Sequence, residues 1–157
     1  LMTGDWITPR YNGYKYFEKP PLQIWATAIA FQAFGAGEWQ ARLWTALTGF
    51  LTILVVGLTA TRIFNARAGW LSALVLASSP MWIISGHFNS LDMALSAFLV
   101  SALCSLLLAQ TSTSKTVCRN WMWVCWSMMA LATLSKGVIG AAIPAMVFIA
   151  YTLSAWD

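Results

Sequence analysis

The sequence predicts an all-α fold: a polytopic transmembrane helical bundle of about five spanning helices with one interfacial (juxtamembrane) helix beside them. Composition is the first observation, because 59% of the 157 residues are hydrophobic and 9% are charged, whereas a typical soluble domain is roughly 25% charged. The second is the spacing of the charges, which leaves uncharged stretches near the length of about 20 residues that a spanning helix needs. The third is the ten tryptophans, since tryptophan gathers at membrane interfaces.

Residues 1–42 are predicted to form an outer loop, because aromatic and charged side chains alternate through its first part as they do at membrane interfaces. Pro20 and Pro21 suit the first turn of a helix, and Gly35 would end it, which gives a helix over about 21–34. At about 1.5 Å per residue this helix is roughly 20 Å long, shorter than a hydrocarbon core of roughly 30 Å. We therefore expect it to lie in the interface or to re-enter, and not to span.

The apolar stretches that follow are predicted to cross the membrane as alternating helices. They lie at about 43–61, 68–86, 93–110, 120–135 and 138–156. The loops with Arg62, Arg67, Lys115 and Arg119 carry no acidic residue, so the positive-inside rule places them in the cytoplasm. The opposite helix ends would then face outward from a bacterial inner membrane.

Residues 1–157 are expected to form a single transmembrane domain that is part of a longer protein. Residues 1–21 do not read as a signal peptide, and the chain stops just after an apolar segment. We expect a first spanning helix and a C-terminal half outside this sequence. The basic residues lie at the ends of apolar stretches, which favours membrane lipids and excludes nucleic acid as partner. Cys104, Cys118 and Cys125 have no metal-ligand spacing and are interpreted as small buried hydrophobes.

Glu18 and Lys19 stand between an aromatic run and the first apolar helix. Charged side chains at membrane depth cost a few kcal/mol each, so each is a functional candidate. The Glu18 carboxylate suits a divalent metal or a sugar hydroxyl, and the Lys19 ammonium suits a phosphate. The alternative is a pair of neighbouring charges near a helix start, with Glu18 favoured by the helix dipole.

Asp92, Lys136 and His87 are the other polar candidates. Asp92 opens an apolar segment, where an acid also stabilises a helix N-terminus. Lys136 has apolar segments on both sides and is followed by Gly137, so its ammonium should lie near lipid headgroups, either in a tight turn or by snorkelling. The only histidine of the sequence, His87, reads as a hydrogen-bonded interface residue more readily than as a metal ligand.

Two segments of this pattern resemble the first-loop signature of a membrane glycosyltransferase family: Gly4–Arg10 (GDWITPR) and Tyr16–Pro21 (YFEKPP). The family is the type C superfamily, which includes bacterial aminoarabinose transferases and relatives of the protein O-mannosyltransferases. Weaker features agree along the chain: Phe34-Gly35 before Glu38, Ala41–Leu43, Ser90–Asp92 and Leu134–Gly137. The Glu-Lys-Pro element in its aromatic setting is the specific part of the resemblance.

The resemblance implies transfer of a sugar from a polyprenyl-phosphate carrier to an acceptor, such as lipid A, protein or another envelope glycan, on the outer face. By the same resemblance, Asp92 and Glu18 are the catalytic candidates, and Glu18 is also the candidate ligand for a divalent metal. Lys19 and Lys136, with Arg10 from the signature, are the candidates that bind the donor phosphate. The family's main general base lies upstream of this sequence, so we expect the chain alone to be inactive.

Two other functions compete with this interpretation. A transporter or channel module would place Asp92 and Lys136 along a substrate path, with charges near the middle of broken spans. In this sequence the charges fall at the ends of apolar stretches, which favours the enzyme. A non-catalytic membrane scaffold is the third interpretation, and the sequence leaves it open.

Overall fold

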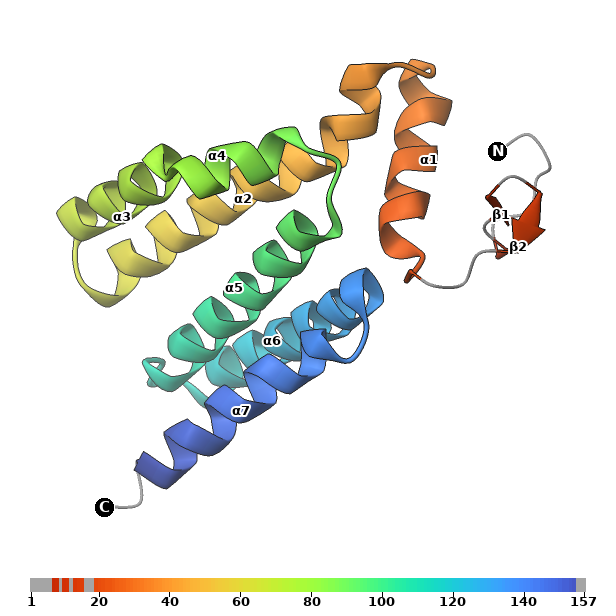
Figure 1. The fold of residues 1–157 in the computed structure, drawn as a ribbon. Coiled ribbons are helices and arrows are strands. Elements are labelled where there is room, and N and C mark those ends of the chain that lie inside the picture. The colour runs from red at the N-terminus through yellow and green to blue at the C-terminus, as the bar shows by residue number, and fades with distance from the viewer. Residues whose placement is uncertain (1–6, 9, 12, 16–18, 155–157) are drawn as a thin grey trace.

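The computed structural model describes residues 7–154 except 9, 12 and 16–18, and within them the chain is almost entirely helical (Figure 1). The helices are α1 (Leu22–Phe34), α2 (Glu38–Ile63), α3 (Ala66–Ser78), α4 (Pro80–His87), α5 (Leu91–Gln110), α6 (Lys115–Lys136) and α7 (Ile139–Ser154). A short antiparallel hairpin, β1 (Arg10–Tyr11) and β2 (Tyr14–Lys15), precedes them. The predicted all-α class is confirmed.

Helix α1 occupies the segment in which the sequence predicts an interfacial helix. It follows the Pro20-Pro21 pair and ends at Gly35. It packs against α2 and also contacts α6. The Gln40 side chain of α2 donates a hydrogen bond of 3.0 Å to the Phe34 carbonyl, which fixes the corner between the two helices.

Two helices are long and apolar enough to cross a membrane, α2 with 26 residues and α5 with 20. The predicted span at 68–86 differs, because it consists of α3 and α4, which are bent by 60° at Ser79. Pro80 explains the bend: a proline disfavours the helical conformation of the residue before it, and Ser79 is extended with ψ 118°. If the bent pair counts as one span, three segments of the described residues meet the criteria for crossing.

The last two predicted spans fall within α6 and α7. Helix α6 begins at Lys115 and includes Arg119, so its charged first turn lies outside the uncharged stretch that the sequence marks as the span. Helix α7 has 16 residues with Pro144 in its interior. These two helices do not meet the length and hydropathy criteria that α2 and α5 meet.

Helices α5 and α6 form the centre of the bundle. Ala102 and Leu106 of α5 pack with Cys125 and Met129 of α6 in one buried cluster, and Phe148 of α7 lies against it. Cys125 is fully buried, as predicted, while Cys104 and Cys118 are half-buried. Figure 1 shows α5, α6 and α7 running alternately up and down beside one another.

Helix α2 buries its small and polar residues and exposes its large apolar ones. The buried face holds Gln40, Thr45, Thr48, Gly49, Thr52 and Thr59, and the hydroxyls of Thr48 and Thr52 donate to backbone carbonyls of α2 itself. Phe50 and Leu58 on the other face are 58% and 64% exposed. This arrangement suits lipid as the surrounding solvent, because small residues mediate helix contacts in a bilayer while large apolar residues face the acyl chains.

Candidate functional site

Four segments meet at one end of the bundle and enclose a polar cavity of about 450 Å³. They are the chain leading into α1, the first turn of α1, the α4–α5 loop with the start of α5, and the end of α6. The residues lining this cavity are Lys19, Pro20, Gln23, Ile24, Asn89, Ser90, Leu91, Asp92 and Lys136. We call it the polar cavity. Candidate site residues that are far apart in the sequence lie together around this cavity.

Asp92 and Lys136 form an ion pair across the polar cavity. Asp92 lies in the first turn of α5 and Lys136 is the last residue of α6. Each charge therefore also faces the favourable end of its own helix dipole. Gly137 ends α6 with φ 80° and ψ −149°, a backbone conformation that is essentially restricted to glycine, so this residue turns the chain away directly behind the ammonium group.

Lys19 and Gln23 bring α1 to the same cavity. Lys19 is exposed, whereas Gln23 is 9% exposed and donates through Nε2 to Asn89 Oδ1 in the α4–α5 loop. The Oε1 atom of Gln23 is buried and has no hydrogen-bond partner among the described residues. A buried acceptor left without a donor costs about 1–3 kcal/mol. The polar cavity therefore contains an acceptor that a ligand or a water molecule can satisfy.

The charges of the polar cavity suit an anion. Among the described residues, two ammonium groups, those of Lys19 and Lys136, and one carboxylate, that of Asp92, line it, so their formal charges sum to +1. Fixed cations beside apolar helices stabilise negative charge more strongly than the same groups in water. The volume also lies within the range of about 300–1,000 Å³ that is usual for small-molecule sites.

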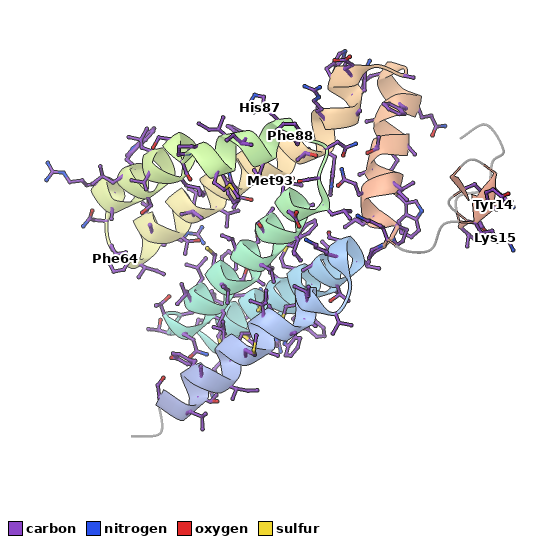
Figure 2. All side chains as sticks on the ribbon, viewed as in Figure 1. Tyr14, Lys15, Phe64, His87, Phe88 and Met93 are labelled. Atoms are coloured by element: carbon purple, nitrogen blue, oxygen red, sulfur yellow. The ribbon has the colours of Figure 1, made fainter. Side chains whose placement is uncertain are left out.

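The predicted site residues divide into three groups. Lys19, Asp92 and Lys136 line the polar cavity together. Arg10 lies on the hairpin opposite Lys15, and Lys15 is drawn well away from α5 and α6 (Figure 2); Arg10 is not among the residues that line the cavity. Glu18 lies outside the described residues.

Gln23 and Asn89 are the cavity residues that sequence reasoning missed as candidates. An amide in the first turn of a largely apolar helix is a signal that could have marked Gln23. Asn89 lies in the short loop before Asp92. Its role depends on a contact across 66 positions of sequence, which no local pattern contains.

His87 behaves as the sequence predicts. Its ring Nδ1 lies 2.7 Å from the Ile83 carbonyl one turn earlier in α4, so this nitrogen carries the proton in that hydrogen bond. In the part of the chain that the structure describes, no group of three or more histidine, cysteine, aspartate or glutamate side chains is placed to hold a metal ion. The described residues therefore do not by themselves fit a divalent metal.

A larger cavity of about 640 Å³ lies between α2 and α4. Its walls are mainly apolar, and its polar rim consists of His87 and the pair Arg42–Glu38, whose Nη2 and Oε2 atoms are 3.8 Å apart. Arg42 is thus already partnered by a carboxylate. The smaller polar cavity is the better candidate for chemistry, because it collects charged side chains from three separate segments.

Comparison with known proteins identifies the family to which this chain belongs. A family model described as dolichyl-phosphate-mannose-protein mannosyltransferase matches residues 18–156. A protein of Proteus mirabilis (strain HI4320), named undecaprenyl phosphate-alpha-4-amino-4-deoxy-L-arabinose arabinosyl transferase 1, is 34% identical over 163 residues, which cover 98% of this chain and 28% of that protein. An uncharacterized protein of Aquifex aeolicus (strain VF5) is 31% identical, covering 98% of this chain and 30% of its own length.

Two solved structures have the same fold: ArnT from Cupriavidus metallidurans in the apo state and the same protein bound to undecaprenyl phosphate. Each matches with a TM-score of 0.95 and 44% identity over 99% of this chain and 29% of its own. The chain thus spans about three tenths of the length of the proteins it matches. It belongs to the dolichyl-phosphate-mannose-protein mannosyltransferase family, which confirms the predicted resemblance to type C membrane glycosyltransferases.

Proposed function

We propose that this chain forms the carrier-phosphate side of the active site of a polyprenyl-phosphate-sugar-dependent glycosyltransferase. The observation that carries the proposal is the convergence of Lys19, Lys136 and Asp92 on one polar cavity at one end of the bundle. The names of the relatives support a lipid-linked sugar donor, because they include undecaprenyl phosphate-linked arabinosyl transferases and a structure bound to undecaprenyl phosphate. The group transferred is a hexosyl or pentosyl unit.

The proposed reaction moves the sugar from phosphate to acceptor. The acceptor atom bonds to the anomeric carbon, the bond from that carbon to the phosphate oxygen breaks, and polyprenyl phosphate leaves with an additional negative charge. Lys19 and Lys136 bind the phosphate and stabilise this charge as it develops. Asp92 holds Lys136 in place and is the catalytic carboxylate on the cavity wall, with Glu18 as its proposed partner. The proton of the acceptor passes to a base outside this chain.

Catalysis should require the remainder of the full-length protein, which also shapes the acceptor site. Lipid A, protein or another envelope glycan is the proposed acceptor. We infer five spans, with α1 in the interface and Arg10 as an additional phosphate contact from the outer loop. The basic loops at the other end of the bundle support an orientation in the bacterial inner membrane with the polar cavity outside.

The charged side chains of the described residues argue against a transporter or channel. Each lies in a loop, in the hairpin or within five residues of a helix end. A substrate path through the membrane would need charged groups near the middle of the spans. The observed placement suits a reaction at the membrane surface.

The test is made in the full-length protein, expressed in a bacterium that lacks its own arabinosyl transferase. Removing one preorganised hydrogen-bond donor that stabilises a developing negative charge typically costs about 10²–10³ in rate, so we expect Lys19→Ala and Lys136→Ala to lower sugar transfer by at least about tenfold. Mass spectrometry of the envelope lipids and proteins gives the readout. Undecaprenyl-phosphate-linked 4-amino-4-deoxy-L-arabinose and mannose are the donors to try.

Lys115→Ala is the matched control, because Lys115 is the cation at the opposite end of the same helix α6. It should leave transfer unchanged, and the amount of each variant in the membrane should equal that of the wild type. Full transfer by both cavity variants would overturn the assignment. A divalent metal at Glu18 is a separate proposal, which EDTA tests without affecting the roles of the two lysines.

A further inference from the structure

The buried amide of Gln23 is a polar group of the polar cavity that phosphate binding does not use. Gln23 lies in the first turn of α1, shortly after Lys19. Its Nε2 donates a hydrogen bond to Asn89 Oδ1. Its Oε1 is buried without a hydrogen-bond partner among the described residues, on a side chain that is 9% exposed. An oxygen in this position accepts a hydrogen bond from a hydroxyl or an amino group, and an anion cannot supply one.

Asn89 complements it. Its Oδ1 is occupied by Gln23, so its Nδ2 group remains the donor end of a side chain that is exposed. Both residues line the polar cavity, and the two amides together hold one acceptor and one donor beyond the hydrogen bond between them. Exchanging the oxygen and nitrogen positions of both amides would only exchange their roles, so the pair offers both functions in either assignment.

The hydrogen-bonding groups of this amide pair select a different kind of ligand from the cations in the same cavity. Lys19 and Lys136 can bind a phosphate of any lipid carrier, because an ammonium group is a compact point charge that recognises an anion with little geometric selectivity. A fixed acceptor beside a fixed donor suits a polyol or an amino sugar, whose neighbouring groups donate and accept in turn. The cavity thus has a charged part and a neutral hydrogen-bonding part.

We propose that the Gln23–Asn89 pair binds the sugar ring of the donor through its hydroxyl or amino groups and is a specificity element of this site. The inference rests on the proposed function, because it assumes that the phosphate of a glycosyl carrier lies at Lys19 and Lys136. It assigns the neutral part of the cavity to the sugar and the charged part to the phosphate.

The experiment compares two ligands on the full-length protein in nanodiscs. One is undecaprenyl phosphate, and the other is undecaprenyl phosphate carrying 4-amino-4-deoxy-L-arabinose. Gln23→Leu should weaken binding of the sugar-bearing lipid by about three- to tenfold, the size expected for one hydrogen bond between neutral groups, and should leave binding of the bare phosphate unchanged. Asn89→Ala should do the same, whereas Lys19→Ala should weaken both lipids equally.

Gln32→Leu is the matched control, since Gln32 is an exposed glutamine of the same helix. It should change neither affinity. If Gln23→Leu and Asn89→Ala leave the ratio of the two affinities at the wild-type value, water satisfies the Gln23 oxygen and the inference is wrong, while the proposed function stands. If the wild-type protein binds neither lipid, the proposed function fails and the inference fails with it.

Discussion

Asp92 and Lys136 are 44 positions apart in the sequence and form an ion pair at the surface of the polar cavity. Their side chains are 62% and 39% exposed. A pair this accessible to solvent contributes only about 0–1 kcal/mol to stability, because water screens the attraction and both side chains lose freedom. The pair therefore fixes the position of the Lys136 ammonium group and adds little to the stability of the fold.

A double-mutant cycle on this pair should separate the two effects. Asp92→Asn, Lys136→Gln and the double variant should give a coupling free energy of unfolding below about 1 kcal/mol, measured by thermal unfolding of the full-length protein in detergent. Sugar transfer should fall in Asp92→Asn by at least about tenfold, since the ammonium loses its fixed position. A variant that unfolds much earlier yet retains full transfer would show that the pair is structural.

The sequence predicted the charged residues of the site better than the neutral ones. Lys19, Asp92 and Lys136 are recognisable because charge near an apolar stretch is expensive and needs a reason. Gln23 and Asn89 carry no charge, and their contact depends on how α1 is placed beside the α4–α5 loop. Tertiary structure alone brings these two amides together.

At the scale of helices, α2 and α3 approach each other closely at a pair of glycines. Gly57 of α2 faces Gly69 of α3, and a methyl group added to Gly69 would lie 2.6 Å from the Gly57 carbonyl oxygen. The Thr61 hydroxyl, which donates to the same carbonyl at 2.8 Å, also borders this position. The absence of a side chain on Gly69 lets the two backbones approach, as small residues do in membrane bundles.

Gly69→Ala should therefore destabilise the protein by about 1–3 kcal/mol, the usual cost of extra volume in a tightly packed place, and lower its Tm in detergent. Gly86→Ala in the neighbouring helix α4 is the control, because its added methyl would meet only the end of Met93 at an ordinary 3.6 Å. Equal Tm values for the two variants would contradict the close packing of α2 and α3.

The bend between α3 and α4 is a feature that the hydropathy of the sequence does not predict. Hydropathy places one apolar stretch at 68–86 and cannot distinguish one straight helix from two that share it. Pro80 was the available signal, because the residue before a proline leaves the helical region. The early start of α6 has a related cause, since charged residues end an apolar stretch but do not end a helix.

Over the whole molecule, the two ends of the bundle differ in character. One end carries the polar cavity. The other carries Arg62, Arg67, Lys115 and Arg119, and the Arg62 guanidinium lies 5.5 Å from the centre of the Trp121 ring, an arrangement typical of a membrane interface. The alternation of the apolar stretches in the sequence predicts a division of this kind, and the direction of the chain through the membrane rests on the positive-inside rule.

Cysteine labelling of the full-length protein tests that direction. In a background without native cysteines, a membrane-impermeant thiol reagent added to intact cells should label Asn89→Cys and should not label Thr113→Cys. Both positions are exposed and lie in loops at opposite ends of α5. Labelling of Thr113→Cys from outside would reverse the proposed orientation.

The Asp92–Lys136 pair also has a mechanical meaning. It joins the first turn of α5 to the last residue of α6, two antiparallel neighbours whose buried contact consists of alanine, leucine, cysteine and methionine. One residue of slip moves a helix by about 1.5 Å along its axis. The ion pair contributes only about 0–1 kcal/mol, so it is the first contact between these two helices to break, and a bilayer whose thickness favours a different tilt would open the end of the bundle that carries the polar cavity before disturbing its buried centre.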